Sequence, residues 1–403
     1  MLKPVDDTRM FEKMAQTLAD TGRYEVHVIG FPGTTSTEYP GVTFHPLPYF
    51  RRISFDRVRA PFRVFRTLRA LSPDVIIVTT HELLLAAAAL RMFRKTVVLY
   101  DIQENYYRNI LYLPTYPLWV RPVLALWVRG WERLLTLFVP RVIASERGYI
   151  DELRFIRHKA LLIENRVKRS TIRPRLGQPR RAQALLFSGT LAESTGVFTA
   201  IHVAGLLHEH DPTVHLTIIG YCAHTETLRQ IREAIEGRDY ITLIGGDQLV
   251  PHDAIMVAIA QADFGLIAYP PNPSTRNTIP TKLFEYIGAG LPVLLINHPA
   301  WMQFCDPYRA ALVFDPRHIH PEEMLYRMRN TDFYVRTPGE EIFWEAEGVQ
   351  LVKLVDETPS RLAQTQMQMQ TQGCSQKTGR GEKISTNNPK ARLFRLPQMP
   401  LVP

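Results

Sequence analysis

The sequence predicts an α/β protein built from two Rossmann-like domains, each with a parallel sheet. Short apolar runs alternate with helix-patterned segments along most of the 403 residues, which is the order expected of β-α units. Several of these runs, such as Val75–Val78 and Val293–Ile296, are apolar at every position, as is typical of strands buried on both faces. The alternation stops at 168–181, a basic segment with prolines and no periodicity, which we interpret as the connection between the domains.

The first domain is predicted to span residues 1–167. It opens with a helix at Asp7–Ala19, in which Met10, Phe11, Met14 and Leu18 form an apolar face. Further strands are expected at Tyr24–Ile29, Val75–Val78, Thr96–Tyr100, Val142–Ala144 and Leu161–Glu164, and helices at Phe50–Leu71, at Leu83–Met92 and, within Tyr116–Phe138, from about Pro122.

A linker at 168–182 leads to a second domain at 183–340. Its strands are expected at Ala184–Phe187, Leu216–Ile219, Ile241–Ile244, Phe264–Ala268 and Val293–Ile296, and its helices at Val197–His208, Thr225–Glu236 and Asp253–Ala260, with a further short helix before the last strand. Glu341–Leu354, within the segment 341–357, is predicted to form a closing helix. The tail at 358–403 is rich in Gln, Met and Thr and has no pattern able to bury a core, so we expect it to lack a stable fold.

The composition limits the classes of function. The formal net charge is +9, but the segment from Glu357 to Pro403 holds seven Lys/Arg and two acidic residues, so the rest of the chain is only mildly basic. No nucleic-acid recognition module is present, and nucleic-acid binding is therefore disfavoured. Cys222, Cys305 and Cys374 are widely spaced and form neither a disulfide nor a metal-binding pattern, which fits a reducing cytoplasm. No apolar run approaches the ~18–20 residues that span a bilayer.

The segment from Asn277 to Pro292 is the most informative part of the chain. Its apolar residues Leu283, Phe284 and Ile287 follow helical spacing, and glycines and Pro292 end the helix before the buried strand. Lys282 and Glu285 are three residues apart, so we place them together on the side of the helix away from the packing. A carboxylate can bind a ribose diol and an ammonium a diphosphate; a solvated ion pair on the helix is the alternative.

The pattern Pro-x-Lys-x-x-Glu-Tyr-x-x-x-Gly-x-Pro at 280–292 resembles the nucleotide-sugar-binding motif of GT-B glycosyltransferases, in particular the retaining enzymes of family 4. The resemblance implies a GT-B fold, in which ligands bind in a cleft facing the carboxyl ends of both sheets, and it implies a closing helix that crosses back to the first domain. It assigns the ribose hydroxyls of the donor to Glu285. Asn277 stands where the family usually has a second glutamate near the transferred sugar.

The turn Ser188-Gly189-Thr190 follows a predicted strand, so its backbone N–H groups can hold a diphosphate. A bare glycine turn is a weak signal, but the resemblance places donor phosphates here and adds Gly220, at the end of the next strand. The family's usual arginine and lysine in this loop are replaced by Thr190 and Thr195. The positive charge is therefore assigned to Lys282 and Arg276.

Candidates for the acceptor side follow strands of the first domain. Asp101 and Glu104 come after the strand Thr96–Tyr100 and are placed to orient or deprotonate an acceptor hydroxyl. His81, with Glu82, follows Val75–Val78 in the same way. Asn165 matches a strand-then-asparagine segment that lines the cleft near the hinge in the family. A capped loop or an ordinary turn is the alternative in each case.

Two basic, aromatic segments suggest a lipid partner. Arginines and tryptophans alternate there with apolar residues, which matches a surface that rests on anionic lipid as well as a solvated helix face. The residues concerned are Arg51, Arg52, Arg57, Arg59, Arg63, Arg66 and Arg69 in the first segment, and Trp119, Arg121, Trp127, Arg129, Trp131 and Arg133 in the second.

Taken together, the sequence predicts an enzyme that transfers a sugar from a nucleotide-diphosphate sugar to a hydroxyl of a glycan or lipid-linked acceptor in cell-surface polysaccharide synthesis. No cofactor other than the donor substrate is expected, and no metal. The predicted location is cytoplasmic, peripheral to the inner face of the plasma membrane. Two alternatives remain open: a GT-B nucleotide-sugar 2-epimerase, which needs no acceptor, and a non-catalytic nucleotide-sugar-binding or membrane-associated member.

The start of the chain departs from the resembled family. A buried strand usually comes first there and feeds a loop with Pro, Asp and Arg, which here are Pro4, Asp7 and Arg9. Only Met1–Lys3 precede them, whereas a strand needs about five residues. The first domain is therefore expected to lack its opening strand or to keep a stub, either because the true start lies upstream or because the chain is a weakened version.

Overall fold

The computed structural model describes residues 2–33, 38–50, 54–113, 116–173 and 181–358. The chain divides into two units, Met1–Asp356 and Glu357–Pro403, and the first contains both predicted domains. The predicted tail lies outside the described residues except for residue 358, as does the middle of the predicted linker. Within the described ranges, no helix has the length and apolar character required to cross a membrane.

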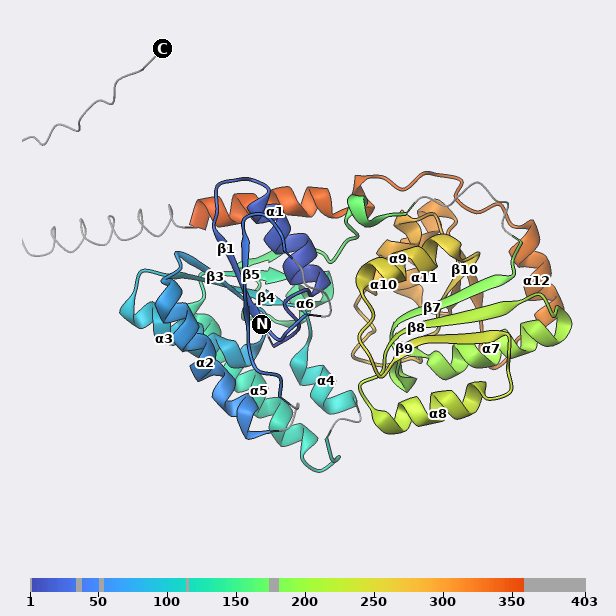
Figure 1. Cartoon of the computed structure of the whole chain (residues 1–403), viewed down its shortest axis with the longest axis horizontal. Helices are drawn as coiled ribbons and strands as arrows, with labels where there is room; N and C mark the ends of the chain where they lie inside the picture. The colour runs from blue at the N-terminus through green and yellow to red at the C-terminus, as the bar shows by residue number, and fades with distance from the viewer. Residues whose placement is uncertain (1, 34–37, 51–53, 114–115, 174–180, 359–403) are drawn as a thin grey trace, which may run out of the picture. The chain divides into compact units, whose positions relative to one another are not determined.

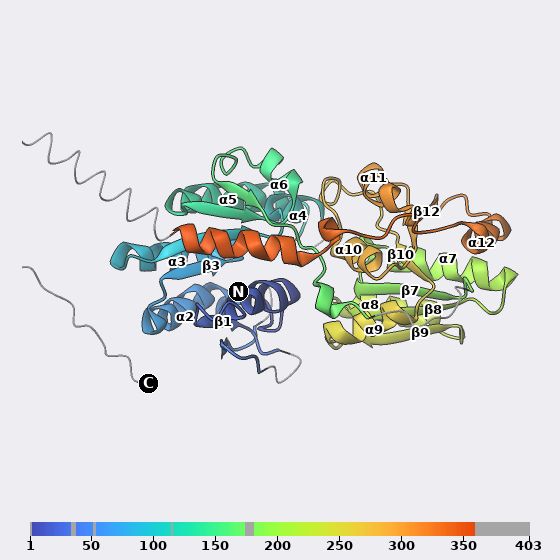
Figure 2. The same cartoon turned by 90° about the horizontal axis from the view of Figure 1, so that it is seen from above.

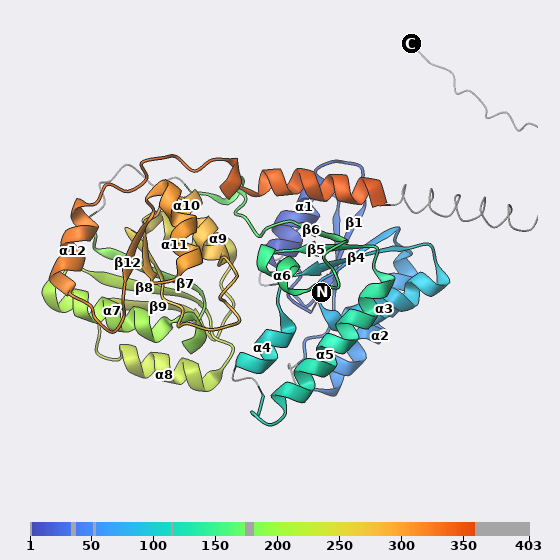
Figure 3. The same ribbon diagram turned by 180° about the vertical axis from the view of Figure 1, so that it is seen from behind.

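The first domain holds two parallel sheets in its described residues (Figure 1). A two-stranded sheet has the order β1-β2 and a four-stranded sheet the order β3-β4-β5-β6. The strands are β1 (Val26–Gly30), β2 (Val42–Pro46), β3 (Val75–Val78), β4 (Val97–Ile102), β5 (Arg141–Ala144) and β6 (Ala160–Leu162). The helices are η1 (Thr8–Ala15), which continues as α1 (Gln16–Ala19), then α2 (Phe55–Leu71), α3 (His81–Phe93), α4 (Tyr106–Tyr112), α5 (Arg121–Leu135) and α6 (Arg147–Glu152). Figures 1 and 3, from opposite sides, show α2, α3 and α5 side by side.

The residues before the first helix pair with the end of β1. Pro4 forms an isolated parallel bridge with Phe31, and the Val5 N–H donates to the Phe31 carbonyl at 2.8 Å. The Asp7 side chain then caps the opening helix by accepting hydrogen bonds from the N–H groups of Arg9 and Met10. Residues 2–5 therefore pair through one bridge where the resembled family has its opening strand.

The second domain is one six-stranded parallel sheet with the order β12-β11-β10-β7-β8-β9. Its strands are β7 (Ala184–Thr190), β8 (His215–Tyr221), β9 (Ile241–Gly246), β10 (Phe264–Ile267), β11 (Val293–Ile296) and β12 (Ala311–Phe314). One apolar cluster takes residues from α7 (Val197–His210), α8 (Thr225–Ile235) and α12 (Pro321–Asn330), and a second takes them from α9 (His252–Gln261), α10 (Thr281–Gly288) and α11 (Pro299–Cys305). The sheet is thus covered on both faces, as its continuous apolar strands predict.

A closing helix begins at residue 344 and packs on the first domain (Figure 2). The Trp344 Nε1–H donates to Thr17 Oγ1 at 2.9 Å, and Glu347 pairs with Arg166 at 3.0 Å. Near the end of the first unit, Asp356 pairs with Arg23 at 2.9 Å. These contacts tie the chain that follows the second domain back to the first.

Candidate functional site

Three glycines lie in one row across the carboxyl ends of adjacent strands. Gly189 of β7 pairs in register with Gly220 of β8, which pairs with Gly245 of β9. A Cβ on Gly220 would lie 1.7 Å from the Gly189 carbonyl oxygen, so no other residue fits. The predicted Gly189 and Gly220 are therefore adjacent, and this end of the sheet presents bare backbone.

The ammonium of Lys282 lies beside this row without a hydrogen-bond partner in the described part of the chain. The side chain is 8% exposed, and Nζ lies over the ring of Phe187 at 4.6 Å and over that of Tyr269 at 5.4 Å. A Cβ on Gly189 would lie 3.4 Å from Nζ. Burial lowers the pKa of Lys282 to about 8, although the nearby Glu285 carboxylate opposes this shift. A buried cation without an acceptor is costly, so the position favours an anionic ligand.

The placement of Lys282 and Glu285 on an outward face of their helix is wrong. Every residue of α10 from Lys282 to Ile287 is buried. The helix is covered all round because its apolar face joins the cluster of β10 and β11, while Lys282 faces the aromatic rings next to the glycine row. A solvated ion pair is thereby excluded for these two side chains.

Glu285 belongs to a charge cluster that includes the first domain. His252, at the start of α9, lies between two carboxylates: Nδ1 is 2.7 Å from Glu12 Oε2, and Nε2 is 3.3 Å from Glu285 Oε1. Burial works against the charged imidazolium, but the hydrogen bonds to Glu12 and Glu285 outweigh it and raise the pKa of His252 to about 10. Burial also opposes the charge on Glu285, yet His252, Lys13 and Lys282 together lower the pKa of this carboxyl. Glu285 is thus held as a carboxylate.

Asn165 joins the two domains next to this cluster. Its Oδ1 accepts a hydrogen bond of 2.7 Å from Lys13 Nζ, and its Nδ2 donates to Thr281 Oγ1 at 2.9 Å. Lys13 is 2% exposed, and burial lowers its pKa to about 8, while the nearby Glu285 carboxylate opposes the shift. The asparagine therefore links Lys13 of the opening helix to the first turn of the motif helix.

The structure assigns Asp101 to a different role from the predicted one. The strand β4 extends through Asp101, whose side chain is fully buried. Arg9 donates two hydrogen bonds to its carboxylate, at 2.9 and 2.7 Å, and Gln103 Nε2 donates a third at 2.7 Å. A carboxylate bound in this way has no free geometry for taking a proton from an acceptor, so Asp101 anchors the opening helix to the sheet.

Glu104 and His81 have partners within the first domain. Glu104 accepts a hydrogen bond of 3.0 Å from the Asn109 amide. His81 begins α3, packs its ring edge-on against Tyr106 with centroids 4.7 Å apart, and places Nδ1 3.3 Å from Glu82. Burial lowers the pKa of His81, although Glu82 opposes the shift. A neutral imidazole is the form that can accept a proton.

The loop before α10 carries Asn277 and Arg276, and both are exposed. This loop packs on α6 of the first domain: a Cβ on Gly148 would lie 2.5 Å from the Asn277 carbonyl oxygen, and the Ile279 N–H donates to Glu146 Oε2 at 3.1 Å. Burial raises the pKa of Glu146 to about 8. Thr190, at the end of β7, is also exposed, and its carbonyl accepts from Thr195 Oγ1 at 2.8 Å.

Sequence reasoning missed several residues of the site. Gly245, His252, Glu12, Lys13 and Glu146 all contact predicted site residues or lie within their cluster. Lys13 could have been recognised from the sequence. It follows Arg9 by four residues, so the two cations lie on one face of the opening helix, inside its apolar pattern. Nothing local marks the other four.

Comparison with known protein families gives two matches. Residues 8–161 match the model of the glycosyl transferase 4-like domain, and residues 168–327 match that of the glycosyl transferases group 1. Among curated proteins, no sequence matches this chain.

Solved structures share the fold at low sequence identity. Sucrose-phosphate synthase from Thermosynechococcus elongatus aligns with a TM-score of 0.63 at 16% identity, covering 86% of this chain and 92% of that one. Anabaena HepE in complex with UDP and glucose gives 0.56 at 15% identity, covering 89% and 98%. A putative UDP-N-acetylglucosamine 2-epimerase from Listeria monocytogenes gives 0.55 at 11% identity, covering 89% and 96%.

Proposed function

We propose that this chain, which belongs to the GT-B glycosyltransferases, transfers a sugar from a nucleotide-diphosphate sugar to a hydroxyl of a glycan or a lipid-linked acceptor. The observation that carries the proposal is the buried, unpartnered ammonium of Lys282 beside the backbone of Gly189. A diphosphate supplies the acceptor atoms that this ammonium lacks. HepE, a protein of the same fold, is described in complex with UDP and glucose, which supports a nucleotide donor.

We assign the parts of the donor to different residues of the second domain. Lys282 and the glycine row hold the diphosphate, and Arg276 adds charge from the exposed loop. Glu285, kept ionised by His252, accepts hydrogen bonds from the ribose hydroxyls. Asn277 contacts the sugar. As the bond to the sugar breaks, negative charge grows on the leaving diphosphate, and a preorganised ammonium stabilises this charge.

The acceptor hydroxyl is assigned to the first domain. Asp101 is occupied by Arg9 and Gln103, so Glu104 and His81 remain as the groups that can orient or deprotonate the acceptor. Closure of the two domains on the donor would exclude water and limit its hydrolysis.

An exposed apolar face on the first domain supports a membrane-bound acceptor. The apolar residues of α2 divide between two faces: Phe55 is 87% exposed and Phe62 is 69% exposed, while Ala60, Val64 and Leu68 are buried. Further large exposed side chains lie on and around α3 and α5 and include Met92, Phe93, Leu118, Trp119, Val123, Leu126, Trp127, Leu134 and Leu137. These helices are neighbours, since α3 contacts both α2 and α5, and exposed apolar side chains gathered on neighbouring helices are typical of an interaction site.

Arginines accompany this face. Arg59, Arg66 and Arg69 are exposed on α2, in the same helix as Phe55 and Phe62. Exposed aromatic residues together with arginines match the interface of an anionic bilayer. We therefore assign the protein to the cytoplasmic side of a membrane, as a peripheral enzyme of cell-surface polysaccharide synthesis.

A screen of nucleotide sugars, with and without a lipid extract, tests the function. Acceptor-dependent release of nucleoside diphosphate is the expected result. Conversion of the donor sugar without an acceptor would instead identify a 2-epimerase. The putative 2-epimerase from Listeria has the same fold as this chain. Donor binding without turnover under any condition would identify a non-catalytic member. The Lys282→Met variant is the control, because it should abolish the activity if turnover occurs at this site.

A further inference from the structure

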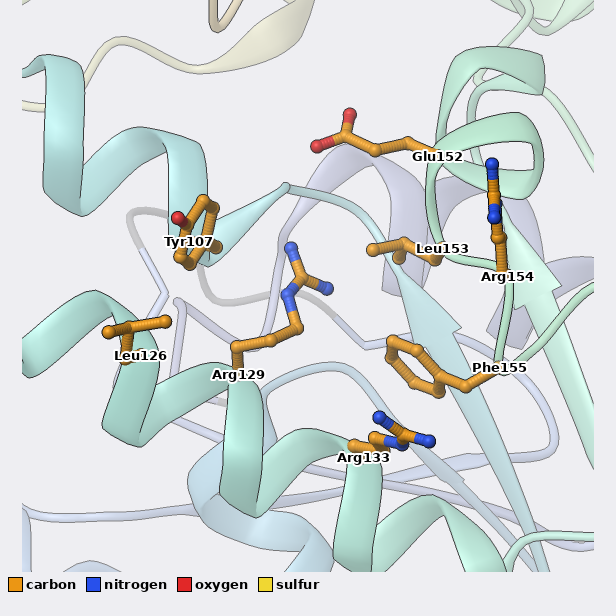
Figure 4. A pocket seen from close by; sticks show the side chains of 8 residues that line it. All are labelled: Tyr107, Leu126, Arg129, Arg133, Glu152, Leu153, Arg154 and Phe155. Atoms are coloured by element: carbon orange, nitrogen blue, oxygen red, sulfur yellow. The ribbon is translucent and has the colours of Figure 1, made fainter. Parts of the chain in front are cut away.

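A pocket of about 620 Å³ lies between α4, α5 and the turn after α6, outside the donor cluster. Figure 4 shows its lining side chains. They are Tyr107 from α4, Leu126, Arg129 and Arg133 from α5, and Glu152, Leu153, Arg154 and Phe155 from the end of α6 and the turn that follows.

Three arginines line the pocket, and two of them, Arg133 and Arg154, add positive charge beyond the ion pair that Arg129 forms with Glu132. Arg129 is held in place, because it donates to Glu132 Oε2 at 2.9 Å and to Asn105 Oδ1 at 2.7 Å. Arg133 and Arg154 are exposed and come from different walls, Arg133 from α5 and Arg154 from the turn after α6, with Phe155 between them (Figure 4). The single carboxylate in the lining, Glu152, is already paired with Arg108 at 2.9 Å. The net positive charge of the lining favours an anionic ligand. The planar guanidinium group of arginine can donate two parallel hydrogen bonds to phosphate oxygens.

The rest of the lining is apolar and continues onto the exposed face. Phe155 and Tyr107 lie on either side of Arg129, whose guanidinium carbon is 5.9 and 5.4 Å from their ring centroids. Leu126 lines the pocket and is also 63% exposed, next to Trp127 at 57%. A ligand with a phosphate and a hydrocarbon chain can therefore place the phosphate among the arginines and the chain along α5.

We propose that this pocket binds the phosphate of a lipid-linked acceptor. The inference rests on the proposed function and adds to it the chemical class of the acceptor and the residues that hold it: Arg133 and Arg154 bind the phosphate oxygens, and Arg129, fixed by Glu132 and Asn105, forms the pocket floor.

The pocket is connected to the donor loop through a short chain of contacts. Glu152 binds Arg108 Nε, and Arg108 Nη1 donates to the Pro273 carbonyl at 2.5 Å, in the loop that continues to Asn277. The other end of α6 contacts the same loop through Gly148 and Glu146. A phosphate held in the pocket is thus one arginine away from the loop assigned to the donor sugar.

Binding of decyl diphosphate below its micelle concentration, measured by calorimetry, tests the assignment. All variants carry Lys282→Met, so that diphosphate capture at the donor site does not contribute. The double variant Arg133→Gln/Arg154→Gln should bind at least about tenfold more weakly, since it loses charge-assisted hydrogen bonds. The control pair Arg238→Gln/Arg327→Gln removes the same charge from exposed positions of the second domain and should change the affinity less than about twofold. Inorganic diphosphate should bind at least about tenfold more weakly than the lipid, because it has no chain to bury.

Equal binding of decyl diphosphate with and without the two pocket arginines would overturn the proposal. The same conclusion would follow if the control pair weakened binding as much, or if inorganic diphosphate bound as tightly as the lipid. Binding of UDP, GDP and ADP to the chain with Lys282 intact reports the donor site separately: its absence would refute the proposed function, whereas a loss confined to decyl diphosphate would refute the pocket alone. Melting curves of each variant establish that it is folded.

Discussion

Glu12 of the opening helix and His252 of the second domain form an ion pair, with 2.7 Å between Oε2 and Nδ1. The other nitrogen of the same imidazole lies 3.3 Å from Glu285, the residue assigned to the donor ribose. One protonated side chain therefore bridges two carboxylates that come from different domains. The contact between the domains and the charge state of the donor site depend on the same group.

Replacing His252 with Gln should destabilise the protein, because it removes the cation that lies between Glu12 and Glu285. The side chain of His252 is 11% exposed, and removal of one partner from a buried pair typically lowers the free energy of unfolding by about 3–5 kcal/mol. Denaturant unfolding measures the loss. His202→Gln, at an exposed position of α7, is the matched control and should change the free energy of unfolding by less than about 0.5 kcal/mol. A His252→Gln protein as stable as the control would contradict the ion-pair assignment.

The contribution of His252 should depend on pH in a defined window. The folded protein raises its pKa from 6.5 to about 10, so the folded state binds this proton more tightly than the unfolded state does. The stabilisation is fully present below pH 6.5, declines between pH 6.5 and about 10, and is lost above that. The difference in free energy of unfolding between the wild type and His252→Gln should shrink across this range. A difference that grows with rising pH would have the wrong sign for a protonated imidazole.

Glu285→Ala should weaken binding of the donor nucleotide about tenfold or more, because it removes a charge-assisted hydrogen bond worth about 1.5–3 kcal/mol. Titration with the nucleotide sugar identified in the screen measures the effect, and the melting temperature shows whether the fold persists. Glu233→Ala, on the exposed side of α8, is the control. Normal donor binding by a folded Glu285→Ala protein would refute the ribose assignment.

Donor binding should weaken as the pH rises above about 8, the value to which burial lowers the pKa of Lys282, because the neutral amine attracts a diphosphate less. Lys282→Arg keeps its charge and should bind with a flatter profile between pH 7 and about 9.5. Lys282→Met should bind weakly throughout. Burial also lowers the pKa of Lys13 to about 8. Any pH dependence of donor binding that remains in Lys282→Met is therefore attributed to Lys13. An unchanged slope in both Lys282 variants would show that Lys282 is not the group that titrates.

Binding to anionic vesicles should be strong at low salt and fall steeply toward high salt, where charge interactions are screened. Arg59→Gln, Arg63→Gln and Arg66→Gln together should weaken it further, as should Phe55→Ser with Phe62→Ser, which removes exposed apolar area from the same helix. Cosedimentation measures both effects, with Arg238→Gln/Arg327→Gln as the charge control. If the wild type does not bind vesicles, or if its binding does not depend on salt, α2 is a solvated helix and not a membrane-binding surface.

The pattern of apolar residues predicted most of the β-α order of both domains, but it missed the strands β2 and β12 and the helices α4, α6, α11 and α12. The spacing of apolar residues along the chain shows whether a segment buries one face of a helix or both faces of a strand. This is a local property of the sequence. For the same reason α5 and β11 occur close to the predicted residues. The motif around Lys282 and Glu285 could be recognised because its residues are neighbours on one helix.

The tertiary structure alone decided which charges meet. Glu12 and His252 are 240 residues apart in the sequence, and Arg9 and Asp101 are 92 residues apart. No local pattern could therefore predict either pair. The buried face of α2 was decided in the same way: Phe55, Phe62 and Leu68 follow helix-like spacing, but of these three only Leu68 joins the core, together with Val64. Spacing determines which residues share a face, whereas the packing of distant segments determines which face is buried and which buried charges find partners.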